Sequence, residues 1–170
     1  EYIDHGFQHL KIYDAITQGH PDDYDAFFHE RYPGIDPLNV TCHGLLYNDW
    51  KSCPYGLRNE SEHPTPWTTR QAIKYLESFD FREQRMFLKV SYHRPHSPYD
   101  PPRRLLEKHL RNGVPKRIIN NTSWDAAFLN TSTMTHNDFH GDPGEAAAEH
   151  SRAGYRGNVE FVDEGVGTIL

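Results

Sequence analysis

A helical period of apolar residues is clearest in the middle of the chain. Between residues 66 and 79 the apolar side chains recur every three or four positions, as they do on one face of a helix. These side chains are Ala72, Ile73, Leu76 and Phe79. Thr68 precedes them and is of the residue type that caps a helix N-terminus. The pattern predicts an amphipathic helix capped by Thr68.

A second apolar period occupies residues 145–170. Pro143 and Gly144 precede an alanine-rich turn, after which apolar residues follow at spacings of four, three, four and three. They are Tyr155, Val159, Val162, Val166 and Ile169. The stripe predicts a long helix with these residues as its core face. Because it is still in register at Leu170, without a capping glycine or a proline, we expect the chain to stop inside a fold.

A short apolar segment of a different kind, residues 86–92, lies between these helices. It reads Met-Phe-Leu-Lys-Val-Ser-Tyr and is rich in residues that favour strands. A helix, a charged turn and an apolar strand form one unit of an α/β sheet, in which a parallel strand is covered on both faces. Shorter helices are predicted near residues 22–32 and at residues 103–112, the second stopped by Gly113.

This pattern divides the chain into four parts. They are an irregular lead-in (residues 1–65), a helix, strand and loop (66–102), a variable connection (103–144) and the long helix (145–170). The 12 prolines and 12 glycines are typical of a loop-rich globular protein. The aromatic share of 13% supplies apolar area for a core, so the composition argues against disorder.

Charge and the cysteines narrow the function classes further. The net charge is −6 without a long run of either sign, which argues against binding to a nucleic acid or to an anionic membrane. No apolar run approaches the roughly 20 residues of a membrane span. The two cysteines, Cys42 and Cys53, are too few for a disulfide scaffold; two free thiols are favoured over one disulfide. The compartment stays open between cytoplasmic and periplasmic or secreted.

The polar residues with a candidate catalytic or binding role lie directly after the predicted strand, in residues 92–102. Four prolines among these eleven residues restrict the backbone and hold the side chains between them in a stiff loop. The polar residues are His93, Arg94 and His96, whose donors suit a tetrahedral anion such as sulfate or phosphate. Ligands of parallel sheets bind beyond the carboxyl ends of the strands. The alternative is a proline-rich connector whose histidines are merely solvated.

The chain resembles sulfatases at three places in the same order. Residues 87–102 resemble the family's apolar strand and its Pro-His-x-Pro loop, followed by tyrosine, aspartate and proline. Residues 69–76 resemble the helix before that strand, and residues 153–170 resemble a helix with a Val-Asp-x-x-Val-Gly run. The resemblance implies the central part of a sulfatase catalytic domain: a partial alkaline-phosphatase-like α/β sheet with flanking helices, which needs the remainder of that domain as its partner.

The resemblance also implies roles for the loop. His96 matches the histidine that contacts the sulfate oxygens and helps to protonate the leaving group, tasks that suit an imidazole. His93 and Arg94 stand where the family varies, and we expect them to line the outer pocket and contact the organic part of the ester. The substrate implied is a small-molecule or glycan sulfate ester.

Other parts of the family's machinery are missing from the sequence. The family's nucleophile is a formylglycine made from a cysteine or serine, with proline two positions later and arginine four positions later. Cys53 is followed by Pro54, one position early, and by Arg58, one position late, and Cys42 fits less well. The family's calcium ligands are also not matched. We therefore expect neither the formylglycine nor the calcium site in this chain, which would be inactive alone.

Two further interpretations of the chain stay open at this point. The first keeps the fold but changes the substrate to a phosphonate or phosphate ester, and the second is a binding or structural domain without catalysis. A group of polar residues in the variable connection imitates a metal site, but a solvated turn is the favoured interpretation for it. Its members are His136, Asp138, His140 and Asp142.

Overall fold

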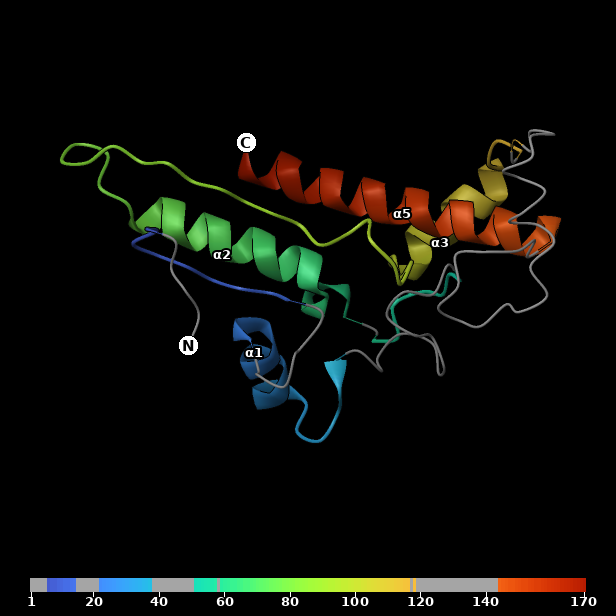
Figure 1. The fold of residues 1–170 in the computed structure, drawn as a ribbon, viewed down its shortest axis with the longest axis horizontal. Helices are drawn as coiled ribbons and strands as arrows, with labels where there is room; N and C mark the ends of the chain where they lie inside the picture. The colour runs from blue at the N-terminus through green and yellow to red at the C-terminus, as the bar shows by residue number, and fades with distance from the viewer. Residues whose placement is uncertain (1–5, 15–21, 38–50, 58, 117, 119–143) are drawn as a thin grey trace.

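Helices form most of the regular structure in the computed structural model of this chain (Figure 1). The structure describes residues 6–14, 22–37, 51–57, 59–116, 118 and 144–170. Its elements are α1 (Asp23–Arg31), the 3-10 turn η2 (Glu60–Glu62), α2 (Pro64–Ser78), α3 (Arg103–Asn112) and α5 (Glu145–Ile169). All four predicted helices are therefore present. Of the predicted variable connection (103–144), residues 117 and 119–143 lie outside the described residues.

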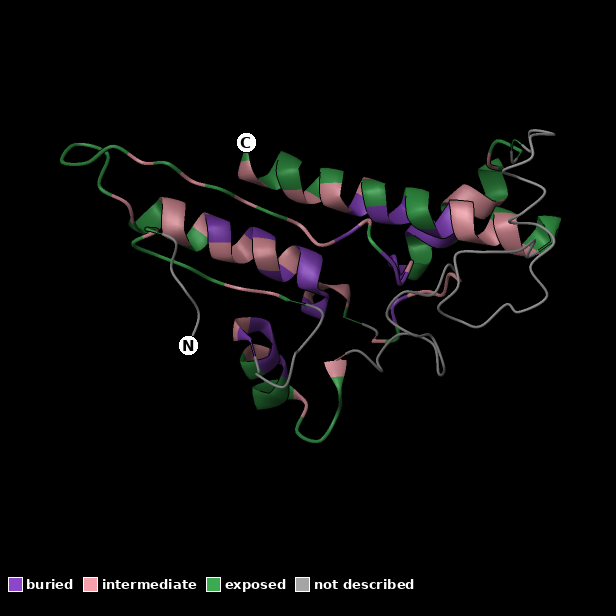
Figure 2. Ribbon diagram, in the orientation of Figure 1, coloured by how far each residue is buried: buried purple, intermediate pink, exposed green. Residues whose placement is uncertain are grey.

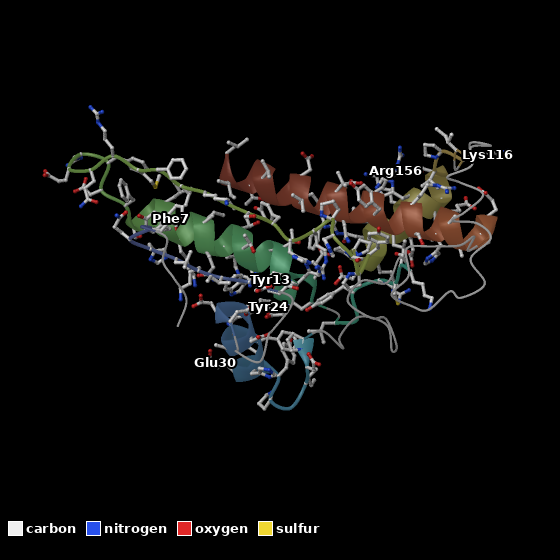
Figure 3. All side chains as sticks on the ribbon, in the orientation of Figure 1. Phe7, Tyr13, Tyr24, Glu30, Lys116 and Arg156 are labelled. Atoms are coloured by element: carbon white, nitrogen blue, oxygen red, sulfur yellow. The ribbon has the colours of Figure 1, made fainter. Side chains whose placement is uncertain are left out.

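Helix α1 is held by its cap and by an aromatic core. The Asp22 side chain accepts a hydrogen bond from the Asp25 backbone, and the Asp25 side chain accepts one from the Asp22 backbone, which forms a capping box. Tyr24 and Phe28 of α1 pack in a core with Trp67 of α2, where the Tyr24 and Trp67 rings meet edge to face at 5.6 Å. Tyr13 joins this cluster, 4.9 Å from Tyr24 between ring centroids (Figure 3).

Helix α2 begins earlier than the sequence predicts. Its N-cap is His63 and not Thr68, because the His63 Nδ1 atom accepts a hydrogen bond from the Thr65 backbone at 3.0 Å. Pro64 then suits the first helical position, since it lacks the N–H group that this position leaves unpaired. The buried face also shifts toward the N-terminus: Trp67 and Ala72 are buried, whereas the predicted Ile73, Leu76 and Phe79 are only half-buried.

Helix α5 has the predicted extent but buries the opposite face. The predicted core face is not the most buried one: Tyr155, Val159 and Val166 are 45%, 43% and 39% exposed, and Val162 and Ile169 are only half-buried. The buried residues are instead Ala153, Gly154, Gly157, Asn158 and Phe161. Small residues let a helix backbone approach its neighbours closely, and a Cβ atom added at Gly157 would lie only 2.8 Å from the Cβ atom of Pro101. Figure 2 shows the exposed face of α5 on the side away from α2.

The predicted strand at residues 86–92 is extended but unpaired. No backbone hydrogen bond joins these residues to another segment within the described part of the chain, which contains a single isolated parallel bridge, Ser52 to Tyr99. Burial alternates along the segment, with Met86, Leu88 and Val90 half-buried and the residues between them exposed. The segment therefore has the side-chain pattern of a strand without a neighbour, and the described residues do not contain the expected sheet.

The cysteine prediction is also corrected. Cys53 is disulfide-bonded, whereas the sequence favours two free thiols; Cys42, the other cysteine of the sequence, lies outside the described residues. The sequence spacing alone could not decide between the two states, since pairing depends on the distance between the two residues in the fold.

In the part of the chain that is described, no helix has both the length and the apolar character to cross a membrane.

Candidate functional site

The loop that carries the three candidate residues is attached to the rest of the fold at its far end. The amide of Cys53 donates to the Tyr99 carbonyl at 3.0 Å, and the amide of Tyr55 donates to the Pro101 carbonyl at 2.9 Å. The Ser52 hydroxyl also donates to the Tyr99 carbonyl, at 2.9 Å. Residues 52–55 therefore fix the backbone on both sides of Asp100.

Arg94 and Asp100 form a buried ion pair across the loop. The Arg94 Nε atom donates to Asp100 Oδ1 at 2.5 Å, and Nη2 donates to Oδ2 at 2.7 Å. The two side chains are 4% and 2% exposed. A bidentate pair of this kind is among the strongest side-chain interactions and fixes the relative orientation of both groups. The seven-residue segment from 94 to 100 is thus closed at its two ends, and His96 lies within this segment.

The charges of this pair balance each other. Burial by itself raises the pKa of Asp100, but the adjacent Arg94 guanidinium outweighs this effect and holds the pKa below its usual range. Burial likewise opposes the charge of Arg94, and the Asp100 carboxylate more than offsets it, so the pKa of Arg94 is raised. Both groups are therefore ionised at neutral pH.

His63 links this ion pair to the start of α2. Its Nδ1 atom accepts the capping hydrogen bond, so the neutral ring carries its proton on Nε2. Nε2 lies 3.3 Å from Asp100 Oδ1, at ion-pair distance although not in hydrogen-bonding geometry. Complete burial lowers the pKa of His63, which keeps the ring neutral at pH 7. The contact is therefore between the Asp100 carboxylate and the dipole of the neutral His63 ring.

Arg94, predicted to contact the ester, is thus placed inside the protein. Two of its guanidinium nitrogens are used by Asp100, and Nη1 is buried without a hydrogen-bond partner among the described residues. The Tyr13 phenol also interacts with this guanidinium, and burial raises the pKa of Tyr13 to about 12. A contact between Arg94 and the organic part of an ester stays a prediction.

His93 is half-buried between two other rings. Its ring centroid lies 4.9 Å from that of His96 and 5.8 Å from that of Tyr13. Burial, and then the positive charges of Arg94 and His96, lower the pKa of His93 to about 4. The ring is therefore neutral at pH 7, where it can form ordinary hydrogen bonds but adds no positive charge to the pocket.

His96 is the exposed member of the group. Its Nδ1 atom lies 2.8 Å from the Ser97 carbonyl oxygen, and because a carbonyl only accepts hydrogen bonds, Nδ1 carries the proton. In the neutral ring Nε2 is then a hydrogen-bond acceptor, and in the protonated ring it is a donor. An exposed imidazole in this tautomer is able to transfer a proton through Nε2.

His93 and His96 lie at the edge of a groove of about 560 Å³. One wall is residues 7–13, the other is residues 87–93, and the floor is the face of α2 that carries Trp67 and Tyr75. Figure 1 shows the two extended segments on either side of α2. Both walls are extended backbone, and the wall at residues 87–92 has its backbone groups unpaired within the described residues.

Sequence reasoning found the loop but missed two of the residues that shape it. Asp100 belongs to the same motif as Arg94, six positions on, and an arginine and an aspartate that flank a proline-rich turn are a usable signal for a pair across it. His63 lies 37 positions before Asp100, and nothing in the sequence connects the two. The structure brings His93 and His96 together and pairs Arg94 with Asp100.

The described residues contain no cluster of three or more histidine, cysteine, aspartate or glutamate side chains that would hold a metal ion. The four polar residues of the variable connection, His136, Asp138, His140 and Asp142, lie outside the described residues. Asp100, the carboxylate nearest the loop histidines in sequence, already has the Arg94 guanidinium as its partner. The described residues near the loop therefore do not fit a calcium site.

Comparison with known proteins supports the resemblance seen in the motifs. No family model matches the chain. The chain is similar to an arylsulfatase. That protein, from Clostridium perfringens (strain 13 / Type A), is 29% identical over 150 residues, which is 88% of this chain. The chain spans 30% of the arylsulfatase's length. The similarity indicates a sulfatase-like segment, and it includes most of the chain rather than the Pro-His-x-Pro loop alone.

Proposed function

We propose that this chain is part of a sulfatase-family hydrolase of sulfate esters, and that His96 contributes to its substrate pocket. Two observations together support the proposal. The chain is similar to an arylsulfatase over 88% of its length, and His96 is exposed in the loop that matches the family motif. The same similarity favours a sulfate ester over a phosphonate or phosphate ester, and a hydrolase over a domain without catalysis.

His96 has two chemical tasks in this proposal. In the protonated ring, Nε2 donates a hydrogen bond to a sulfate oxygen, which lowers the energy of the negative charge there. The same N–H group lies ready to transfer its proton to the leaving oxygen of the ester. The hydrogen bond from Nδ1 to the Ser97 carbonyl fixes the ring orientation for both tasks.

His93 and Arg94 act around His96 in this proposal. His93 stays neutral at pH 7 and lines the pocket beside His96, where it contacts the organic part of the ester in this proposal. Arg94 contributes its positive charge to the local field, although most of that charge is balanced by Asp100. We place His93 in substrate binding and Arg94 in the local field, and neither in the proton transfer.

The remainder of the catalytic machinery belongs to other parts of the domain in this proposal. In the family, a formylglycine and a calcium ion supply the nucleophile and the neutralising charge. The described residues match neither, so the remainder of the parent domain would contribute both. The same remainder would add strands beside residues 86–92 and complete the partial alkaline-phosphatase-like sheet, because an unpaired strand with alternating burial needs a hydrogen-bonding neighbour.

The test is His96→Ala in the full-length protein, assayed with an aryl sulfate. We expect kcat/KM to fall by about tenfold to ten-thousandfold, as is typical of losing a general acid or an anion donor. The matched control is His29→Ala, which removes another exposed histidine, in the last turn of α1. Wild-type kinetics in His96→Ala would remove His96 from the site. Turnover of phosphonate esters but not of sulfate esters would contradict the substrate class.

A further inference from the structure

The loop around His96 is held at both ends by the ion pair of Arg94 and Asp100, which we call the clamp. Arg94 and Asp100 bracket residues 95–99 and close them with two short hydrogen bonds, at 2.5 and 2.7 Å. Both side chains are almost fully buried, so water competes little for these bonds. Inside the bracket, the His96 amide donates to the His93 carbonyl at 3.1 Å, which forms a tight turn.

The Asp100 end of the clamp is anchored to three other parts of the fold. Residues 52–55 hydrogen-bond the carbonyls of Tyr99 and Pro101, the residues on either side of Asp100. His63, the cap of α2, lies 3.3 Å from the Asp100 carboxylate. Helix α5 presses Gly157 against Pro101. A displacement of Asp100 would therefore disturb several elements at once, which makes it a rigid reference point for the loop.

A buried ion pair of this kind is weak evidence for a purely stabilising role. Removing both charges from water is costly, and apolar residues of similar volume often stabilise a fold equally well. What apolar residues do not supply is a fixed orientation of the backbone between the two paired side chains. His96 occupies the middle of that backbone, and its ring is held by Ser97 and His93 of the same loop, so the position of the ring follows that of the loop.

From this geometry we infer that Arg94 and Asp100 are positioning residues for His96, an inference that rests on the proposed function. The pair holds the loop so that the His96 Nε2 atom points to where the ester binds. Catalytic groups displaced by about 1 Å lose roughly a hundredfold in rate, so the orientation of this loop matters for turnover. Neither Arg94 nor Asp100 needs to touch the substrate for this role.

The decisive variant replaces both members of the pair, as Arg94→Met with Asp100→Leu, in the full-length protein. Apolar replacement removes the clamp without leaving a buried unpaired charge, so we expect a melting temperature within a few degrees of wild type. We expect kcat to fall by about tenfold to a hundredfold with KM changed far less. The control Arg104→Met breaks an exposed ion-pair network with Glu60 and Glu164 and should leave kcat unchanged.

The same double replacement, compared in the wild-type and His96→Ala backgrounds, separates a positioning role from a general loss of structure. In a His96→Ala background, the double apolar replacement should change kcat/KM by no more than about twofold, because the group that the clamp positions is absent. A merely structural role would lower kcat/KM by the same factor in both backgrounds. Should the double variant fail to fold, Arg94→Lys keeps the charge beside Asp100 but loses the bidentate geometry, and the same loss in kcat is expected.

Deuterium exchange gives a readout that does not need the proposed function. The peptide spanning residues 91–99 should take up deuterium faster in the double variant than in wild type, while peptides of α2 and α5 exchange unchanged. Wild-type kcat together with unchanged exchange at residues 91–99 would overturn the positioning role and leave the sulfatase proposal intact. Faster exchange in a protein that hydrolyses no sulfate ester would instead keep the clamp and reject the proposed function.

Discussion

The face of α5 that carries Gly154 and Gly157 gives the sharpest test of how this fold is packed. Gly157→Ala adds one methyl group, which would lie 2.8 Å from Cβ and 2.9 Å from Cγ of Pro101. A proline ring cannot rotate away as a flexible side chain would, so α5 or the loop has to move. Gly167, on the same helix, has nothing within 4 Å of an added Cβ atom and is the matched control.

The expected magnitude follows from two opposing terms. Replacing a helical glycine by alanine stabilises a helix by about 0.5 to 1 kcal/mol, because the unfolded chain loses conformational freedom. Overpacking a close contact costs about 1 to 3 kcal/mol. Gly167→Ala should therefore raise the free energy of unfolding by up to about 1 kcal/mol, and Gly157→Ala should lower it by roughly 0.5 to 2 kcal/mol.

Urea unfolding of the two variants beside wild type measures this difference. Both variants replace a helical glycine by alanine, so a gap between them larger than the propensity change of about 1 kcal/mol reports the contact with Pro101. Equal stabilisation of Gly157→Ala and Gly167→Ala would refute the close approach of α5 to the loop. That result would favour the apolar stripe through Val159 as the packed face.

Two further predictions concern stability. The pKa of His93, about 4, and that of His63 lie below the roughly 6.5 of an unfolded histidine, so the unfolded state binds more protons and stability falls as the pH drops from about 6.5 toward 4. Urea midpoints at pH 7, 5.5 and 4 check this trend, and a constant midpoint would contradict it. Phe28→Ala, at a fully buried position, should cost about 3 to 5 kcal/mol in a thermal or urea melt; a loss below about 1 kcal/mol would contradict the aromatic core.

The helices could be predicted because their signals are local. The period of apolar residues located α2 and α5, and Gly113, with a φ of +75°, ends α3 where the sequence places the stop. The cap of α2 could not be predicted, because helix N-caps are most often Ser, Thr, Asp or Asn. Here the Nδ1 atom of His63 accepts the same hydrogen bond. Boundaries of this kind depend on one side chain and not on a pattern.

The face of α5 could not be predicted from apolar residues alone. Counting apolar side chains selects Tyr155 and Val159, but contact with the loop is made by Gly154 and Gly157, which such a count does not register. Close backbone approach depends on the absence of a side chain. A stripe of small residues was therefore the signal that would have identified the buried face.

The sequence predicts the proline-rich loop that carries the candidate residues, but not how the side chains of this loop are arranged. A motif on one continuous loop identified His93, Arg94 and His96 together. The burial of Arg94 against Asp100 and the approach of His63 depend on tertiary packing between distant segments, which no local pattern contains. The predicted strand has the right side-chain alternation but requires neighbouring strands that the described residues do not supply.

Whether His96 acts in sulfate-ester hydrolysis is tested by the release of inorganic sulfate from an aryl sulfate by the full-length protein, compared between wild type and His96→Ala at matched folding stability. We expect steady sulfate release by wild type and a loss of at least about tenfold in the variant. Equal sulfate release by both proteins, or none by wild type, would contradict it.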